Sequence, residues 1–384
     1  DEIKGVNKPQ LATGMTPIKW DSNLNEIETT IDDPEWYDYA NKKWANAKTA
    51  DGSYWVWIPR YAYKITKGYH DSVTGEIEIK FLIGSTNLSQ NDTNIYSTNY
   101  KAFENDTSKN YFLHPAFDFN GRHLGFGVAK FEASVANLSN SCYTNPNENN
   151  CNIDNLIPKI IPNATSWRYI NTKNAFNVSL KMKNNTSIYG WIPEEVDTHL
   201  IKNTEWGAIA YLSKSKYGSH NEEIWNNSYT GYKTGCSSSN VNASNETMCY
   251  AYNDVNNNGP KASTTHNIYG IYDMSGGVWE RVMATYNNLN GSSGFSLNEI
   301  KNIDSKYIDR YITSEEYLLN GMGLDYDNNI YGDAFFETSK DIARYNGSKW
   351  IGNIAGSWYN DGSYIAYIDS PFISRGGSYV NATN

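Results

Sequence analysis

The residues best suited to chemistry are two acids on either side of a glycine pair. Asp273 and Glu280 lie seven residues apart, and the carbonyl groups of Gly276 and Val278 lie between them. Two carboxylates with intervening backbone oxygens form the ligand set that a hard cation such as Ca²⁺ prefers. The alternative is a tight turn whose acids accept hydrogen bonds from backbone amides. The spacing therefore predicts either a calcium site or a capped turn.

The segment around these acids resembles the signature of a known enzyme family. Residues 267–280 read NIYGIYDMSGGVWE, which is similar to the GLYDMSGNVWEW signature of the formylglycine-generating-enzyme/sulfatase-modifying family. Members of that family have a variant of the C-type lectin fold and bind calcium at the Asp, Gly, Val and Glu positions. The resemblance therefore implies Ca²⁺ ligands at Asp273, Gly276, Val278 and Glu280. Gly277 departs from the signature by replacing an Asn, and Arg281 by replacing a second Trp.

Further segments resemble the same family, in the same order along the chain. Residues 54–59 resemble its VWIP strand, residues 126–134 its EVT strand, residues 204–206 its TEAEW helix, and residues 375–379 its RGGSW motif. The resemblance implies an α+β, C-type lectin-like fold, rich in loops, with short antiparallel sheets and about two helices.

The same resemblance divides the chain into a domain and an arm. We expect residues 51–384 to form the lectin-like domain, with cysteine-stapled insertions, and residues 1–50 to form an irregular extension or docking arm with a short strand near residues 18–20. Family members continue past the last motif into a core strand, so we expect that closing strand to be missing from this chain.

Hydrophobic patterns predict the elements that must position the acids. The β-branched and aromatic run 54–65 predicts strand, with either an edge position or a bend at Pro59, and the alternating run 76–83 predicts its hairpin partner. Residues 166–182 suit an amphipathic helix. Residues 199–212 predict a helix capped by Asn203, with one buried stripe that places Trp206 in the core.

Charge, hydrophobicity and cysteine spacing indicate which kinds of partner and which environment to expect. The net charge is −10 and the 32 basic residues form no run, which argues against nucleic-acid binding. No apolar run reaches the roughly 18–20 residues that cross a bilayer, so we expect membrane attachment only through a segment absent from this chain. Two local cysteine pairs, Cys142 with Cys151 and Cys236 with Cys249, lack accompanying histidines and predict disulfides of an extracellular protein. Free buried thiols are the alternative.

The chain lacks reactive side chains at the positions where formylglycine-generating enzymes carry them. Formylglycine-generating enzymes bind copper through a cysteine pair after the Gly-Gly-Ser motif, and Asn381 stands at the first of these positions. Asn cannot replace a thiolate ligand. The six histidines show no His-x-x-x-His spacing, and no Gly-x-Ser-x-Gly elbow or phosphate-binding glycine loop occurs. We therefore expect no catalysis and no redox cofactor, with an oxidase-type enzyme as a distant alternative.

The C-terminal region favours binding. It combines rigid rings with short polar side chains, a composition typical of recognition surfaces. The same region of this fold carries the variable residues of retroelement-diversified phage and bacterial surface proteins, so the resemblance implies a ligand-binding face. The predicted ligand-binding residues are Trp350, Trp358, Tyr359, Asn360, Asp361, Tyr364, Tyr367, Asp369, Tyr379 and Asn381. The alternative is that these rings fill an irregular core.

The sequence thus predicts an extracellular protein of a cell surface, filament or virion that binds a cell-surface glycan or protein. The alternative is a structural subunit that assembles with copies of itself into a filament, pilus or virion fibre. A size measurement distinguishes them, because a discrete small species favours the binder and filaments favour the subunit.

Overall fold

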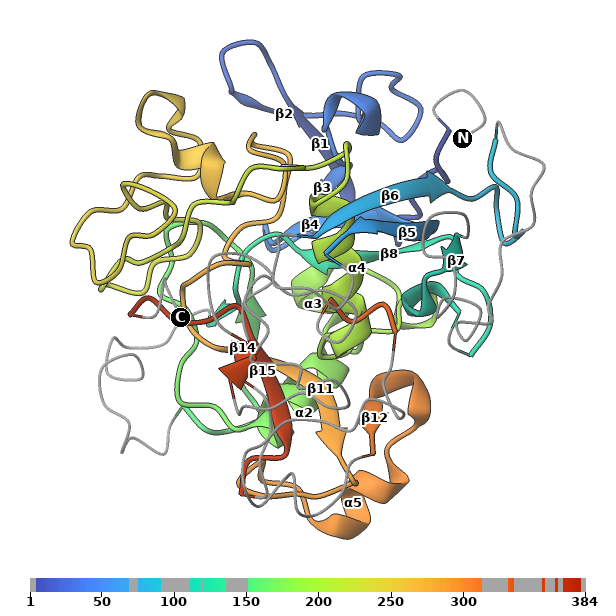
Figure 1. Cartoon of the computed structure of the whole chain (residues 1–384), viewed down its shortest axis with the longest axis vertical. Coiled ribbons are helices and arrows are strands. Elements are labelled where there is room, and N and C mark those ends of the chain that lie inside the picture. The colour runs from blue at the N-terminus through green and yellow to red at the C-terminus, as the bar shows by residue number, and fades with distance from the viewer. Residues whose placement is uncertain are drawn as a thin grey trace.

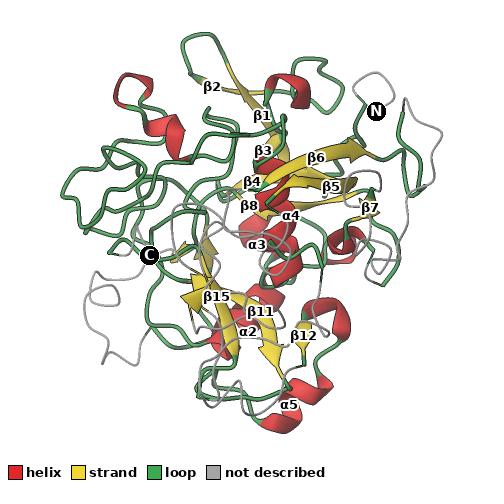
Figure 2. Cartoon of the chain, viewed as in Figure 1, coloured by secondary structure: helices red, strands yellow, loops and turns green. Residues whose placement is uncertain are grey.

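The computed structural model describes residues 5–68, 75–90, 111–118, 120–135, 151–312, 331–334 and 369–380, together with the backbone of residues 354–355 and 363–364. Helices, short sheets and long loops mix along this chain, which confirms the α+β class (Figure 2). Between α4 and η5 the chain runs through residues 214–254 without helix or strand. The lectin-like fold itself remains a prediction.

Strands near the N-terminus form one five-stranded antiparallel sheet with the order β2-β1-β3-β4-β8. Its strands are β1 (Thr16–Trp20), β2 (Glu26–Glu28), β3 (Asn46–Lys48), β4 (Tyr54–Pro59) and β8 (Gly125–Ala129). Strand β8 therefore lies at one edge. The expected strand near residues 18–20 is β1.

The predicted hairpin is present in a second sheet. It has the order β6-β5-β7, with β5 (Tyr61–Lys67), β6 (Glu76–Phe81) and β7 (Phe112–Leu113). The chain leaves β4 at Pro59 and enters β5 two residues later, so the expected bend at this proline transfers the run 54–65 from one sheet to another. A two-stranded sheet joins β9 (Ser134–Val135) and β10 (Pro158–Lys159).

The C-terminal sheet has the order β12-β11-β15-β14-β13. Its strands are β11 (Glu280–Tyr286), β12 (Asp309–Tyr311), β13 (Ile354–Ala355), β14 (Ser363–Tyr364) and β15 (Phe372–Arg375). The β11–β12 pair is parallel and the others are antiparallel. Strand β11 begins at Glu280, opposite Arg375, so the sheet joins the two segments that carry the family-like motifs.

Four α-helices occur in the described part of the chain, with short 3₁₀ turns between them. The helices are α2 (Thr172–Met182), α3 (Thr186–Tyr189), α4 (Asn203–Ser213) and α5 (Leu297–Asn302), and the 3₁₀ turns are η1 (Tyr39–Asn41), η3 (Pro115–Phe117), η4 (Pro193–Glu195), η5 (Val255–Asn257), η6 (Gly259–Ala262) and η7 (Ser305–Tyr307). The helix predicted over residues 166–182 begins only at Thr172, because Asn171 caps it by accepting a hydrogen bond from the backbone N–H of Asn174.

Helix α4 lies at the centre of the molecule, between the sheets of the two chain halves (Figure 1). All eleven of its residues are buried, so the expectation of one buried stripe was wrong. The helix contacts both β6 and β11, which leaves no face for solvent. Lys202, not Asn203, precedes the first turn as the cap residue, and its backbone N–H donates to Glu205 Oε2 at 2.8 Å.

The first fifty residues differ from the irregular arm that the sequence predicts. Strands β1 and β3 pair with each other, and β3 pairs with β4. Trp36 and Trp44 have no exposed surface and belong to the same core cluster as Trp206 of α4. Each large ring buried in this way contributes about 2–3 kcal/mol, so this segment is part of the folded body.

Candidate functional site

Two glycine pairs cross beside the predicted cation ligands. The N–H of Gly276 donates to the carbonyl of Gly376 at 2.7 Å, and the N–H of Tyr379 donates to the carbonyl of Gly277 at 2.9 Å. Gly276 has a φ of +81°, and a Cβ there would lie 1.9 Å from Asn226 Oδ1. Only glycine fits such a crossing. Two backbone hydrogen bonds therefore join the 273–280 motif to the 375–379 motif, although the two motifs lie about a hundred residues apart in the sequence.

Asp273 lies at the base of this crossing and is 1% exposed. Its Oδ1 accepts hydrogen bonds from Asn227 Nδ2 and from the N–H of Gly235, both at 2.9 Å. Its Oδ2 accepts from the N–H groups of Glu132, at 3.2 Å, and of Gly235, at 3.0 Å. One carboxylate thus joins three segments. Burial raises the pKa of Asp273 to about 6, although these donors favour its charged form.

Two further carboxylates lie around the crossing. Glu132 is buried, and it accepts hydrogen bonds from the N–H of Val278 at 2.9 Å and from Ser166 Oγ at 2.5 Å. Burial, together with the charges of Asp273 and Glu280, raises the pKa of Glu132 well above its usual value. Sequence reasoning did not single out Glu132, although it lies in the segment that resembles the family's EVT strand.

Glu280 connects the crossing to the central helix. Its Oε2 accepts a hydrogen bond of 2.7 Å from the indole Nε1–H of Trp206, whose core position the sequence predicts. The guanidinium of Arg375 lies 3.8 Å from the centre of that indole ring. Burial raises the pKa of Glu280 to about 7, and Trp206 and Arg375 oppose the rise.

The contacts of Asp273 match the capped turn, which was the alternative reading of the spacing. Three N–H groups, from Asn227, Gly235 and Glu132, donate to the Asp273 carboxylate, and that of Gly235 is shared between its two oxygens. The described residues include no group of three or more His, Cys, Asp or Glu side chains arranged to hold a metal. A calcium site at Asp273, Gly276, Val278 and Glu280 stays a prediction that binding measurements must test.

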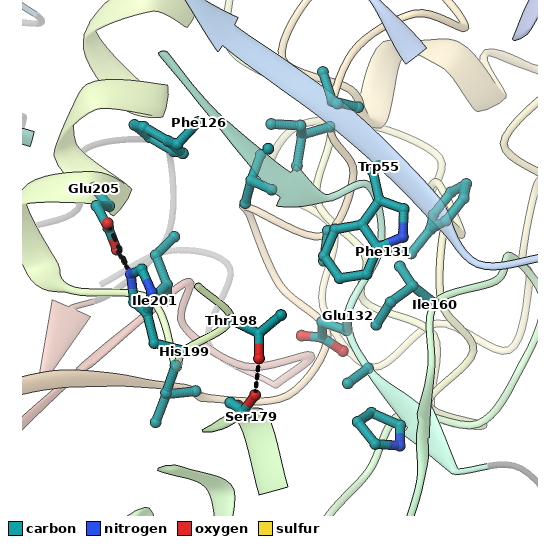
Figure 3. A pocket seen from close by; sticks show the side chains of 18 of the residues that line it. Trp55, Phe126, Phe131, Glu132, Ile160, Ser179, Thr198, His199, Ile201 and Glu205 are labelled. Carbon is teal, nitrogen blue, oxygen red and sulfur yellow. Dashed lines mark hydrogen bonds and ion pairs between the residues drawn. The ribbon is translucent and has the colours of Figure 1, made fainter. Parts of the chain in front are cut away.

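A cavity of about 820 Å³ opens next to the crossing. Figure 3 shows it between Phe126, Ile201 and His199 on one side and Trp55, Phe131 and Ile160 on the other. Its wall is mainly apolar, and Glu132 is among the few acids that line it. This size is within the usual range for ligand pockets, about 300–1,000 Å³.

An ion pair between a half-buried histidine and a buried glutamate lies in one wall of the cavity. His199 Nε2 lies 2.9 Å from Glu205 Oε1 (Figure 3). Its Nδ1 lies 2.9 Å from the carbonyl oxygen of Asp197. Burial alone would lower the pKa of His199, but Glu205 outweighs this effect and raises it. Nearby, Thr198 Oγ1 donates to the carbonyl of Ser179 at 2.7 Å. These contacts attach the extended residues 196–201 to α2 and α4.

Partly exposed rings surround an arginine on another part of the cavity wall. Tyr379 meets Tyr232 edge to face at 4.6 Å, and their hydroxyls are 2.8 Å apart. The guanidinium of Arg168 lies 3.6 Å from the centre of the Tyr232 ring and 4.7 Å from that of Tyr169. We call these four residues the tyrosine–arginine cluster. All four line the cavity.

Of the predicted ligand-binding residues, Tyr379 alone is placed at this cavity by the described residues. Asp369 is exposed, and its carbonyl accepts a hydrogen bond from Ser292. Tyr364 is described only as backbone of β14. The other predicted residues, Trp350, Trp358, Tyr359, Asn360, Asp361, Tyr367 and Asn381, lie outside the described residues.

The cysteine prediction is confirmed for one pair. Cys236 and Cys249 form a disulfide, which is typical of an oxidising, extracellular-type environment. Cys151 is buried and also disulfide-bonded, and its expected partner, Cys142, lies outside the described residues. Within the described chain, no helix has the length and apolar character needed to span a bilayer.

Comparison with known proteins leaves the family open. No protein-family model matches this chain, and no curated protein matches it.

Proposed function

We propose that this chain is a non-catalytic ligand-binding or adhesion protein of an extracellular surface, with a C-type lectin-like fold related to formylglycine-generating enzymes. The tyrosine–arginine cluster is the observation that carries the proposal. Its rings are held in place by ring–ring and cation–π contacts and remain partly exposed. Rigid aromatic side chains of this kind provide contact area at low entropic cost.

Two other observations support the proposal. The Cys236–Cys249 disulfide fits an extracellular location. The bonds between the two glycine pairs place the 375–379 motif beside the 273–280 motif, an adjacency that a shared lectin-like centre requires. The ligand we propose is a cell-surface glycan or protein, because tyrosine hydroxyls and an arginine offer hydrogen bonds next to flat apolar rings.

The test measures binding of the purified protein to an array of immobilised glycans and extracellular proteins. Tyr379→Ser should weaken each interaction about tenfold, since it removes a ring from the cluster. Tyr250→Ser is the matched control, because Tyr250 is also partly exposed but does not line the cavity. Equal loss in both variants, or no array binding by the parent protein, would contradict the proposal.

A further inference from the structure

Strand β8 presents a row of outward backbone groups at the edge of its sheet. Trp57 of β4 lies opposite Gly127, and the N–H of Trp57 donates to the carbonyl of Ala45 on the other side. Trp57 and Gly127 are therefore a non-hydrogen-bonded pair of the antiparallel ladder. It follows that the N–H and C=O groups of Gly125, Gly127 and Ala129 point away from β4.

Nothing in the described part of the chain pairs with this side of β8. The sheet order ends at β8, and its five residues stay partly or fully exposed. A Cβ built on Gly127 would meet no atom within 4 Å. Open strand edges recruit other strands, and proteins usually cover, charge or bulge them. β8 is uncharged and its ladder with β4 is regular.

The cavity follows this open edge. Its wall includes every residue of β8, although successive side chains of a strand point to opposite faces. The space therefore reaches around the edge of β8, and it also extends over the sheet, because Ala47 of β3 and Trp55 of β4 line it as well. The extended residues 196–201 form part of the wall as well. Five strand residues span about 17 Å, which suits one short added strand.

A buried donor beside the edge has no acceptor. Trp57 is 6% exposed, and its indole Nε1–H has no hydrogen-bond partner in the described structure. Ring atom Cε2, which is bonded to Nε1, would lie 2.6 Å from a Cβ on Gly125, so the polar edge of the indole lies over β8. An unpaired buried donor of this kind costs about 1–3 kcal/mol. A carbonyl brought in along the edge would satisfy it.

From these observations we propose that β8 is a docking edge for an extended segment of a partner polypeptide, which inserts into the cavity as an additional strand. The partner's main chain would pair with the outward groups of Gly125, Gly127 and Ala129. The inference goes beyond the proposed function, because it does not require any ligand at the tyrosine–arginine cluster.

The wall defines the chemistry of the inserted segment. The inserted segment would contact Phe126, Ile201 and Ile209 on one side, and Trp55, Val178 and Met182 on the other. A strand with apolar, β-branched side chains on both faces fits such a slot. An oligosaccharide does not supply amide donors and carbonyl acceptors at strand spacing.

A second copy docking through its own β8 fits less well. Pairing of two such edges would bring the glycines of both strands into the space, and Gly125 and Gly127 have no side chains to fill about 820 Å³. The partner segment must carry large side chains. We therefore assign the edge to a different polypeptide segment.

The experiment adds a capped, lysine-flanked peptide with the core Val-Ile-Val-Thr-Val to the intact protein. Hydrogen exchange should slow about tenfold or more at the amides of Gly127 and Ala129, because strand pairing protects them. The same peptide N-methylated at alternate residues should give no protection, since it cannot form the ladder.

Gly127→Pro supplies the matched variant, because it removes an outward N–H that makes no bond within the sheet. It should weaken peptide binding about tenfold, while Gly127→Ala and Tyr250→Ser, at a partly exposed residue outside the cavity wall, should not. If Gly127→Pro fails to fold, the comparison between the unmodified and the N-methylated peptide is the test of the inference. Absence of protection, equal binding of the N-methylated peptide, or protection that follows protein dimerisation would each overturn the inference. An effect of Tyr379→Ser on array binding alone would leave it standing.

Discussion

The glycine crossing and the β8 edge are neighbouring regions with opposite character. At the crossing, both carboxylate oxygens of Asp273 accept hydrogen bonds from N–H groups, and Gly276 leaves no room for one further carbon. At β8, the backbone of Gly127 faces open space, and the indole N–H of Trp57 has no acceptor in the described structure. Backbone hydrogen bonds between two distant segments hold the fold together at the crossing, while a strand edge with unpaired backbone groups is suited to binding.

The largest expected effect tests whether the crossing is as closed as its contacts indicate. Gly276→Ala should lower the free energy of unfolding by about 3 kcal/mol or more, because the new Cβ would overlap Asn226 and Asn227 at positive φ. Urea denaturation followed by far-UV circular dichroism measures the loss. A loss below about 1 kcal/mol would mean that the crossing can relax, and the contrast with β8 would fail.

A second prediction concerns pH and sharpens the description of the buried carboxylates. The pKa of Glu280 is raised from 4.5 to about 7, so the folded state holds a proton that the unfolded state releases between these values. The free energy of unfolding should therefore fall as pH rises from about 5 to 8, by about 2 kcal/mol for this group. Glu280→Gln keeps a hydrogen-bond acceptor for Trp206 but cannot titrate. This variant should therefore lack the contribution of Glu280 to the fall in the free energy of unfolding.

These unfolding measurements are made in EDTA and repeated in excess calcium. The difference between wild type and Glu280→Gln cancels the other titrating groups. An identical pH profile in both proteins would contradict the prediction. If calcium abolishes the fall and raises the melting temperature of the wild type only, the cation site predicted from the sequence is supported. If calcium has no effect, hydrogen bonds alone hold the carboxylates.

The smallest effect is expected at β8. Gly127→Ala should change the free energy of unfolding by no more than about 0.5 kcal/mol, and a slight gain would follow from the reduced entropy of the unfolded chain. The same urea titration compares it directly with Gly276→Ala. A loss similar to that of Gly276→Ala would show that β8 is covered in solution.

Much of the local structure could be predicted from neighbouring residues. Alternation over residues 76–83 predicts β6, and short separation predicts the Cys236–Cys249 disulfide. The first fifty residues were misread, because Trp36 and Trp44 lie in irregular segments without periodicity. Only the packing around α4 gives these rings their core positions.

By itself, the sequence determined the strands over residues 54–65 and 76–83, the central helix and the closeness of the glycine turn to two acids, because those features depend on residue types at fixed short spacing. Tertiary structure alone decided that Glu132 meets Val278, that Arg375 stacks on Trp206, and that a cavity follows β8. Each of these joins segments more than a hundred residues apart, or concerns a space that only the packed chain encloses. Local pattern carries no information on such distances, because the same strand or turn can pack against many partners.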